Sequence, residues 1–574
     1  MKIIGVHNTG IISSAALVIN GELLFGAAEE RFSRQKHSKY YPHTAISKAL
    51  DWAGLSIDDI DCFAVGWNPA INIASKYRAG LSEWTNHPGE RFFSNPNHLL
   101  PRLNKANYVE TEQIFHTDKG KEVRIHYVNH HLAHCATAYY LSGFSDAAIL
   151  SCDGFGEKAS TVFAVGDEKA IKIIEEFDFP NSVGSFYSAI TECLGFRVDH
   201  DEWKTMGASA FGDPTRFRDA IANLVPIGKD GYKLDLNYFA HYSFDIHGML
   251  NPAGQKLLKE IRPSDGADLS QEHYDLAAAA QERLEEVMFD LVNKLMQKTG
   301  KDRLVLCGGV AMNCVFNGKV SASGLLRDVF IPYAPDDSGN SIGAALYVAV
   351  QHDRQGTKRF YNVVSPFLGD EWTDDRVKEE LDRMCVSYQQ IENPCKIAAK
   401  LVADGGVVGW FQGRMEFGQR ALGSRSILAD PRKPDMKDRV NIAVKFRERF
   451  RPFAPAILEE RVLDYFIIPE NTTVPYMEKA FPFRDDKKME VPAVVHEDGT
   501  GRLQTVSRSL KPEFYEMISE FNKITGTPLV LNTSFNLAGD PIVSSPKEAV
   551  QTFYSSGITA LVIGSFLLLK KKQQ

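Results

Sequence analysis

The sequence predicts an α/β protein of two domains, the first of which contains a repeated unit. Strands and helices alternate along most of the 574 residues, which is typical of α/β folds. A strand followed by a hairpin occurs at residues 2–27, and a similar unit recurs at residues 147–174. Two related halves that face each other would place a nucleotide or a metal in the cleft between them.

The first unit begins with a strand at Lys2–Val6 and continues with a hairpin. Asn20 and Gly21 form its turn, because a two-residue hairpin turn requires positive φ values that these residue types adopt. The second unit begins with a strand at Ala147–Cys152 that ends in Asp153-Gly154. The further elements that we expect are helices at 42–53, 132–141, 271–299 and 340–350, and strands at 303–306 and 328–331.

A polar stretch with glycine and proline at residues 351–376 predicts the boundary between the domains. We place the first domain at residues 1–355 and the second at residues 356–574. The second domain again mixes strands and helices, and Leu529–Leu531 is one of its predicted buried strands.

The composition predicts a soluble globular protein of the cytoplasm. Apolar residues make up 44% of the chain, and no apolar run approaches the ~18 residues of a membrane helix. The N-terminus enters a strand without a signal region, and the eight cysteines form no CxxC pair, so we expect reduced thiols. A net charge of -8 argues weakly against nucleic acid as a partner.

Two histidines, His130 and His134, predict a metal site. If they start a helix, their i,i+4 spacing places both on one face, where they can bind one ion, while His131 points elsewhere. Asp153 and Asp337 each follow a strand and precede a turn with glycine, a position typical of ligands in a cleft. Such a set suits Fe(II), Mn(II) or Zn(II), although an isolated HxxxH is more often structural.

A second motif indicates a nucleotide. Gly308 and Gly309 follow a strand and precede a helix, so their N–H groups are suited to phosphate, and Asn313 could reach a ribose or base. Lys204 lies in EWKTMG and could form a second wall of the same site. A tight turn requires glycine in any case, and an exposed lysine before a loop is an equally good explanation of Lys204.

Arginines concentrate in the predicted second domain. From residue 413 to residue 455 there are eight arginines and three lysines against five acidic residues. Arg420 and Arg425 lie around a glycine, and a guanidinium fork matches phosphate and carboxylate oxygens. On charge alone a solvated basic face is an equal alternative, but the phenylalanines and prolines interleaved here favour a buried polyanion pocket. Ser534 and Asn536 lie on one face of an extended segment and could contact an adenylate or an amide.

Together these motifs resemble the NodU/CmcH O-carbamoyltransferase family. The resemblance covers nearly the whole chain and rests on nine motifs in family order: EERFSRQKH, HHLAH, CDGFGE, EWKTMG, CGGVAMNC, DDSGNSIGAA, GRMEFGQRALGSRSILADPR, RPFAP and NTSFN. It implies an N-terminal ASKHA domain, which is a duplicated ribonuclease H-like fold, and a C-terminal domain similar to YrdC proteins.

The resemblance also implies a reaction. The YrdC-like domain would bind carbamoyl phosphate and ATP with Mg²⁺ and form carbamoyl-adenylate, releasing phosphate and pyrophosphate. In the ASKHA-like domain an iron-type metal would assist transfer to a hydroxyl of a small acceptor, such as a sugar or a polyketide in natural-product or antibiotic biosynthesis.

The family's site residues map onto matching positions of this chain. His130, His134 and Asp337 match the metal-ligand motifs, and Asp153 is expected as a further ligand. Gly308, Gly309 and Asn313 match the nucleotide-contacting turn. The residues that match the carbamoyl-adenylate site are Arg420, Arg425, Lys445, Arg447, Arg451, Ser534 and Asn536.

One segment departs from the family pattern. Family members often read HDASAAL in the first hairpin, whereas this chain reads IISSAAL at Ile11–Leu17. No base for the acceptor hydroxyl is therefore assigned from this segment. The acceptor pocket is expected in Trp67–Val123, which could equally form a surface excursion or the contact of a homodimer.

Other functions are weighed against this one. A threonylcarbamoyl-type tRNA enzyme is disfavoured by the acidic charge and by the lack of a basic arm. A non-catalytic ASKHA switch is disfavoured because it would not explain the arginine-rich region of the second domain. A HypF-type maturation factor is disfavoured because zinc-finger cysteine pairs and an acylphosphatase-like N-terminus are missing.

Overall fold

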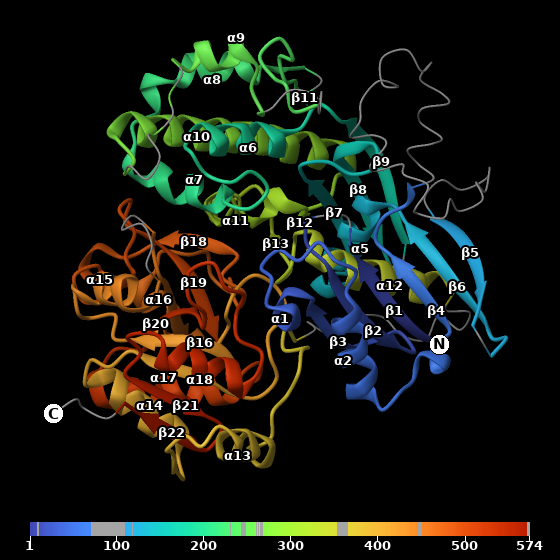
Figure 1. Cartoon of the computed structure of the whole chain (residues 1–574). Helices are drawn as coiled ribbons and strands as arrows, with labels where there is room; N and C mark the ends of the chain where they lie inside the picture. The colour runs from blue at the N-terminus through green and yellow to red at the C-terminus, as the bar shows by residue number, and fades with distance from the viewer. Residues whose placement is uncertain are drawn as a thin grey trace. The chain divides into compact units, whose positions relative to one another are not determined.

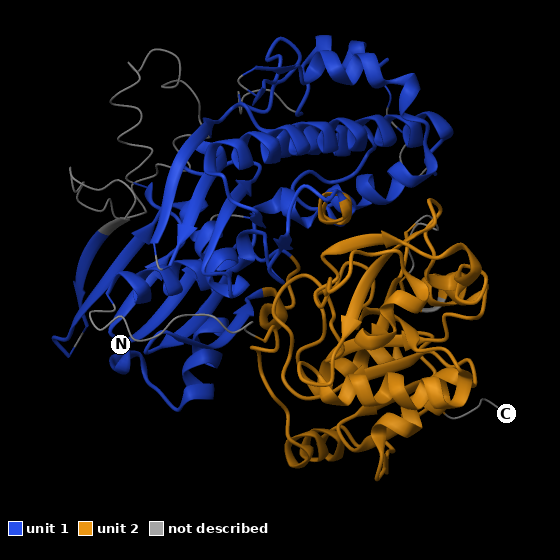
Figure 2. Cartoon of the chain, turned by 180° about the vertical axis from the view of Figure 1, so that it is seen from behind, with its two compact units in different colours: residues 1–29, 37–316, 323–364 blue, residues 30–36, 317–322, 365–574 orange. Residues whose placement is uncertain are grey.

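The computed structural model divides the chain into two compact units (Figures 1 and 2). Unit 1 comprises Met1–Glu29, His37–Phe316 and Ser323–Val364, and unit 2 comprises Glu30–Lys36, Asn317–Ala322 and Ser365–Gln574. The structure describes residues 1–8, 11–69, 110–117, 119–168, 170–229, 231–242, 248–259, 261, 263, 268–352, 365–445 and 451–570. The boundary predicted at 355/356, most of the Trp67–Val123 segment and Arg447 lie outside the described residues.

The first half of unit 1 is a sheet with the strand order β3-β2-β1-β4-β6-β5. Its strands are β1 (Lys2–His7), β2 (Ser14–Ile19), β3 (Glu22–Ala28), β4 (Cys62–Val65), β5 (Glu110–His116) and β6 (Glu122–Val128). The first three strands form an antiparallel meander, whereas β1, β4 and β6 run parallel. Asn20 (φ 51°) and Gly21 (φ 79°) form the predicted hairpin turn.

The second half repeats this arrangement with the order β13-β12-β7-β8-β9. Its strands are β7 (Asp146–Cys152), β8 (Ala159–Asp167), β9 (Ala170–Asp178), β12 (Arg303–Cys307) and β13 (Asp328–Phe330). Again the first three strands are antiparallel neighbours and β7, β12 and β13 run parallel. The duplicated ribonuclease H-like fold expected for the first domain is therefore confirmed by strand order and direction.

Each half ends in a helix that follows its last parallel strand. These helices are α5 (His130–Ser142) and α12 (Asn340–Gln351), and they pack against each other. The approach is close because Gly343 of α12 has no side chain: a Cβ there would lie 1.9 Å from the carbonyl oxygen of Ala133 in α5. This contact brings the beginnings of the two helices together.

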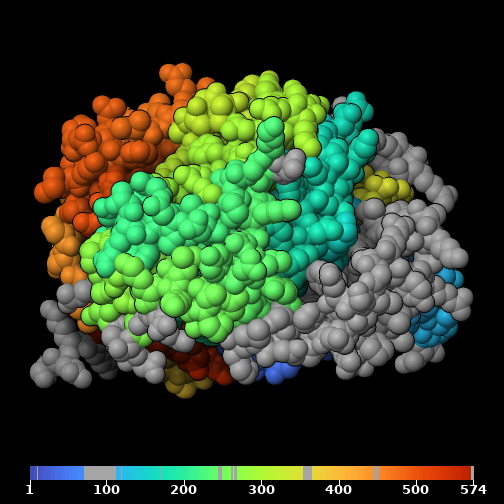
Figure 3. All heavy atoms as spheres, turned by 90° about the horizontal axis from the view of Figure 1, so that it is seen from above, coloured from blue at the N-terminus to red at the C-terminus, as the bar shows by residue number. Residues whose placement is uncertain are grey.

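The second half also carries a helical segment between β9 and β12. Its longest helix, α10 (Gln271–Thr299), packs on α6 (Val183–Cys193), α7 (Glu202–Ala208) and α8 (Arg218–Leu224). Residues of this segment form the green face in Figure 3. No helix among the described residues is long and apolar enough to cross a membrane.

Unit 2 contains a nine-stranded mixed sheet with the order β14-β22-β21-β15-β16-β20-β17-β19-β18. Its central strands are β15 (Val408–Phe411), β16 (Arg425–Ala429), β20 (Leu529–Ser534) and β17 (Ala454–Leu458). The outer strands are β14 (Gln389–Gln390), β22 (Phe566–Leu569), β21 (Ala560–Ile563), β19 (Thr500–Val506) and β18 (Lys479–Pro482). Helices α14 (Pro394–Ala403) and α17 (Pro512–Thr525) pack on each other beside a core that includes Trp410 and Phe521. The prediction of a mixed α/β fold is thus confirmed for both units.

Candidate active site

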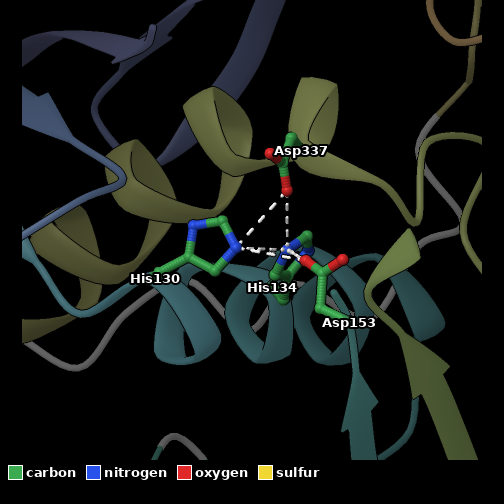
Figure 4. A group of neighbouring side chains, drawn as sticks. All are labelled: His130, His134, Asp153 and Asp337. Carbon is green, nitrogen blue, oxygen red and sulfur yellow. Dashed lines mark hydrogen bonds and ion pairs between the residues drawn. The ribbon is translucent and has the colours of Figure 1, made fainter. Parts of the chain in front are cut away.

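Four predicted ligands of unit 1 converge on one point (Figure 4). His130 and His134 project from the first turns of α5, one helical turn apart. Asp153 directly follows β7, and Asp337 lies in the short 3₁₀ turn before α12. The four side chains therefore come from the end of β7, the beginning of α5 and the turn that precedes α12.

The potential ligand atoms are spaced like the corners of one coordination shell. His134 Nε2 lies 2.8 Å from Asp153 Oδ2 and 3.2 Å from Asp337 Oδ1. His130 Nε2 lies 3.1 Å from Asp153 Oδ2, 3.4 Å from Asp337 Oδ1 and 3.1 Å from His134 Nε2. Metal–ligand bonds of about 2.0–2.2 Å separate neighbouring ligand atoms by roughly 3.0–3.5 Å, so the residues fit a first-row divalent ion.

Each carboxylate directs one oxygen to this point and has the other held elsewhere. Asp153 Oδ1 accepts hydrogen bonds from the N–H groups of Gly154 (2.8 Å) and Gly309 (3.2 Å). Asp337 Oδ2 lies 3.5 Å from Nε2 of His7. Because the outer oxygens are held, the inner oxygens are aimed at the histidines, as expected of ligands oriented by an outer shell.

The beginning of α5 is held by two polar side chains. Asn129 caps the helix by accepting a hydrogen bond from the N–H of Leu132 at 2.8 Å. Glu157 accepts from the N–H of His130 (2.9 Å) and from the N–H of Asn68 (2.6 Å). Burial raises the pKa of Glu157 to about 7, although these N–H donors oppose the shift. A buried carboxyl group thus fixes the residue that carries the first histidine.

The electrostatics of the cluster favour a bound cation. Burial alone would lower the pKa of His130 and His134, but the carboxylates of Asp337 and Asp153 outweigh it and raise both pKa values. Burial would raise the pKa of both aspartates, yet the histidines hold these pKa values below the usual one. The two carboxylates thus favour positive charge beside them. A divalent metal can supply that charge in place of the protons on the histidines.

His131 points away from the cluster, as its position in the helix predicts. Its Nδ1 lies 2.8 Å from Ser151 Oγ, and its Nε2 lies 2.8 Å from the carbonyl oxygen of Ala159. Burial lowers its pKa to about 3, so the ring stays neutral and ties α5 to β7 and β8.

His7 is a residue of the site that the sequence analysis did not identify. It is fully buried, contacts Asp337 and lies with its ring centroid 5.8 Å from that of His130. His7 ends β1, while Asp153 directly follows β7, the equivalent strand of the second half. In the sequence, His7 directly follows the predicted strand Lys2–Val6, as Asp153 follows the predicted strand Ala147–Cys152, and that position was the signal that could have identified it.

The predicted nucleotide residues of unit 1 take structural positions. Gly308 has φ 85°, and a Cβ there would lie 2.2 Å from the carbonyl oxygen of Cys152, while Gly309 donates to Asp153. Asn313 forms a reciprocal amide pair with Gln281 at 2.9 and 3.1 Å. Lys204 pairs with Asp201 at 3.2 Å and lies over a phenylalanine ring. Nucleotide contact by these four residues therefore stays a prediction.

Three predicted residues of unit 2 also come together. Lys445 ends a π-helical turn, a feature frequent at functional sites, and its Nζ lies among neutral oxygens at the end of β20. It donates to the Oγ of Ser534 at 3.2 Å and to Oδ1 of Asn536 at 2.7 Å, as well as to both main-chain carbonyls. Ser534 Oγ in turn donates to Asn536 Oδ1 at 2.6 Å. A buried ammonium group and two polar side chains thus form one cluster.

The arginines of unit 2 differ in their surroundings. Arg425 is completely buried, and its Nη atoms donate to the main-chain carbonyls of Gln412, Gly413 and Ser424 at 3.0–3.1 Å. Burial lowers its pKa to about 10. Arg420 and Arg451 are partly exposed. Arg425 therefore organises the surrounding chain, and its contact with a ligand stays a prediction.

Known proteins bear out the resemblance. The family model "Carbamoyltransferase N-terminus" matches residues 2–346, and "Carbamoyltransferase C-terminus" matches residues 399–570. The nodulation protein NolNO of Sinorhizobium fredii is 37% identical over 568 residues, which cover 97% of this chain and 79% of the relative. Nodulation protein U of Rhizobium tropici is 28% identical over 94% of this chain and 91% of the relative.

Among solved structures, the chain is similar to full-length HypF in its phosphate- and nucleotide-bound form. The identity is 12%, the TM-score is 0.30, and the match covers 62% of this chain and 56% of HypF. This distant likeness bears on no functional argument. The two family models together with the nodulation relatives show that the chain belongs to the carbamoyltransferase family and is an enzyme that transfers carbamoyl groups.

Proposed function

We propose that this carbamoyltransferase is an ATP-dependent O-carbamoyltransferase that works in two half-reactions. The observation that carries the proposal is the buried cluster of His130, His134, Asp153 and Asp337 in a chain that matches both carbamoyltransferase models. The cluster of Lys445, Ser534 and Asn536 in unit 2 supplies a second polar centre. Two centres of different chemistry suit an enzyme that activates a carbamoyl group and then transfers it.

In the proposed first half-reaction, unit 2 uses ATP with Mg²⁺ to activate carbamoyl phosphate. One water cleaves carbamoyl phosphate to carbamate and phosphate, and a carbamate oxygen then attacks the α-phosphorus of ATP. The new P–O bond gives carbamoyl-adenylate, and pyrophosphate leaves. Lys445 and Arg420, with Arg447 and Arg451, would offset the negative charge that develops on the phosphates. Ser534 and Asn536 would orient the carbamoyl group.

In the proposed second half-reaction, the acceptor hydroxyl attacks the carbonyl carbon of carbamoyl-adenylate. The C–O bond to the acceptor forms, the bond between the carbonyl carbon and the phosphate oxygen of AMP breaks, and the hydroxyl proton is released to solvent. His130, His134, Asp153 and Asp337 would hold a divalent metal, Fe(II) being the first candidate, which supplies Lewis acidity for such a step. Gly309 donates to Asp153 and would hold it in place for this role. Gly308, Gly309, Asn313 and Lys204 are proposed to contact the nucleotide.

The proposed acceptor is a small hydroxylated molecule, such as a sugar or a polyketide. All eight cysteines are free thiols, which supports a reducing compartment such as the cytoplasm. The acidic net charge of -8 supports a small-molecule acceptor over a nucleic acid.

The test is mass spectrometry of a reaction that holds the protein, ATP, carbamoyl phosphate and Mg²⁺. We expect carbamoyl-adenylate, pyrophosphate and phosphate only when both substrates are present. Two variants separate the half-reactions. Lys445→Met should lose pyrophosphate formation and retain metal, whereas His130→Ala should lose metal and retain pyrophosphate formation. ADP without pyrophosphate in the wild-type reaction would contradict the proposal.

A further inference from the structure

Residues 30–36 belong to unit 2, although the residues on both sides of them belong to unit 1 (Figure 2). We call this segment, Glu30–Lys36, the strap. It begins with the short helix α1 (Glu30–Ser33) and lies outside the part of the chain predicted to form the second domain. Its presence in unit 2 raises the question of which part of that unit it holds.

Two arginines of the strap are bound to main-chain carbonyls of unit 2. Arg31 Nη2 donates to the carbonyl oxygen of Gly418 at 2.7 Å, and only 3% of Arg31 is exposed. Arg34 donates to the carbonyls of Ile542 (2.7 Å) and Pro541 (2.8 Å). A guanidinium is costly to bury without partners, so the Arg31 contact is part of the interior of unit 2.

Gly418 lies in the segment 413–425, which we call the arginine loop. Glu416, only 1% exposed, closes this loop: its Oε1 accepts hydrogen bonds from the N–H groups of Leu422 (2.7 Å) and Arg425 (3.2 Å). Arg425 in turn donates to the carbonyls of Gln412 and Gly413. The conformation of the loop therefore depends on a buried carboxylate and a buried guanidinium.

One atom in each of the side chains of Arg31, Arg425 and Glu416 lacks a hydrogen-bond partner among the described residues. These atoms are Arg31 Nη1, Arg425 Nε and Glu416 Oε2. Burial lowers the pKa of Arg31 and Arg425. The charges of Glu30 and then Glu416 oppose that shift in Arg31, and the charge of Glu416 opposes it in Arg425. Arg31 and Arg425, together with the buried Lys511, thus place positive charge near the buried carboxylate of Glu416. Removal of Arg31 would take away one of these three positive charges and the donor to the carbonyl of Gly418.

We propose that Arg31 is a positioning residue of unit 2, which holds the arginine loop in shape so that Arg420 can act on the substrate phosphates. The inference rests on the proposed adenylate-forming reaction. It means that the activity of the C-terminal part of the enzyme depends on the charge of one side chain near the N-terminus.

The experiment uses full-length Arg31→Gln and Arg31→Lys, with Arg34→Gln as the matched control from the same strap. Hydrogen–deuterium exchange of the arginine loop and the rate of pyrophosphate formation are measured for each. Arg31→Gln should lose protection in the loop and slow pyrophosphate formation roughly tenfold to a hundredfold, as displaced catalytic groups do. Arg31→Lys keeps the charge and should restore both quantities in large part. Arg34→Gln should raise exchange at residues 541–545 and leave the loop unchanged.

The outcomes separate this inference from the proposed function. Unchanged loop exchange in Arg31→Gln overturns the inference, whatever the activity. Equal losses in Arg31→Gln and Arg31→Lys also overturn it, because the charge would then not be the decisive property. If the wild-type enzyme forms no pyrophosphate, the proposed function fails, and the exchange data alone still decide whether the strap holds the loop. Metal content should be equal in all variants.

Discussion

At the scale of single residues, metal binding depends on the orientation and protonation of each ligand as much as on its residue type. For His130 Nε2 to bind a metal, its Nδ1 must carry the proton, and that N–H requires an acceptor. The side-chain amide of Asn340 is fully buried, with Nδ2 3.2 Å from Nδ1 of His130 and Oδ1 without a hydrogen-bond partner among the described residues. A half-turn of this amide brings Oδ1 to Nδ1 as the acceptor that metal binding needs.

We therefore expect Asn340→Asp to bind Co(II) or Fe(II) nearly as tightly as the wild type, since the carboxylate retains the acceptor. Asn340→Leu should weaken the affinity roughly tenfold to a hundredfold, the usual effect of losing an outer-shell partner. Chelator competition measures both affinities. If Asn340→Asp were as weak as Asn340→Leu, the amide would act as a donor to His130, and the assignment of its tautomer would be wrong.

Individual residues also show how far sequence reasoning reached. The spacing of His130 and His134 and the position of Asp153 after a strand were enough to predict that they meet, because these relations are local. The contact of His7 with Asp337 could not be found in this way, since Asp337 lies in the turn before α12, more than three hundred residues later. The surroundings of Arg425 could not be predicted either, because its sequence context does not reveal that its Nη atoms donate to carbonyl groups.

At the scale of elements, the site is built where strands end and helices begin. The turn between β12 and α11 (Cys314–Ala322) is one of these points. It is tight, because Gly308 has φ 85° and lies close to the carbonyl oxygen of Cys152. This turn also presents Gly309 to Asp153. Local patterns predicted nearly all of these elements within a few residues, because the spacing of apolar residues and the turn residues can be read from the neighbouring sequence.

Gly308→Ala should therefore destabilise unit 1 by roughly 2–4 kcal/mol, because the new methyl group meets a carbonyl and the backbone is left-handed. Gly154→Ala is the matched control beside the same aspartate. A Cβ at Gly154 has no atom within 4 Å, so the change should stay within about 0.5 kcal/mol. Urea unfolding followed by fluorescence compares the two, and equal midpoints would contradict this account of the turn.

At the scale of the whole molecule, the metal and the arginine loop belong to different units. A ligand that binds only the folded form stabilises it by about 2.7 kcal/mol at a hundred times its Kd. Chelation of the metal should therefore increase hydrogen exchange in α5 and α12 of unit 1. Exchange in α17 and β20 of unit 2 should not change. An equal increase in both units would show that metal binding stabilises the chain as one cooperative body.

The division into units was predictable only in part. Composition indicated the polar stretch after residue 350, and unit 2 begins for the most part at Ser365. The membership of the strap and of Asn317–Ala322 in unit 2 was not predicted, because nothing in a local pattern tells which distant surface a short segment will cover. Their contacts, such as Asn317 Nδ2 with the carbonyl of Glu478 at 2.8 Å, join residues far apart in the chain.

The strap has a consequence for synthesis on the ribosome. Arg34 and its partner Ile542 are separated by 508 residues. At roughly 5–20 residues per second, the strap leaves the exit tunnel on the order of 25–100 s before the carbonyl that it binds. Unit 2 can reach its final form only when the chain is almost complete. During translation the nascent protein therefore carries two arginines without their carbonyl partners, and a chaperone that binds cationic segments has that interval in which to act.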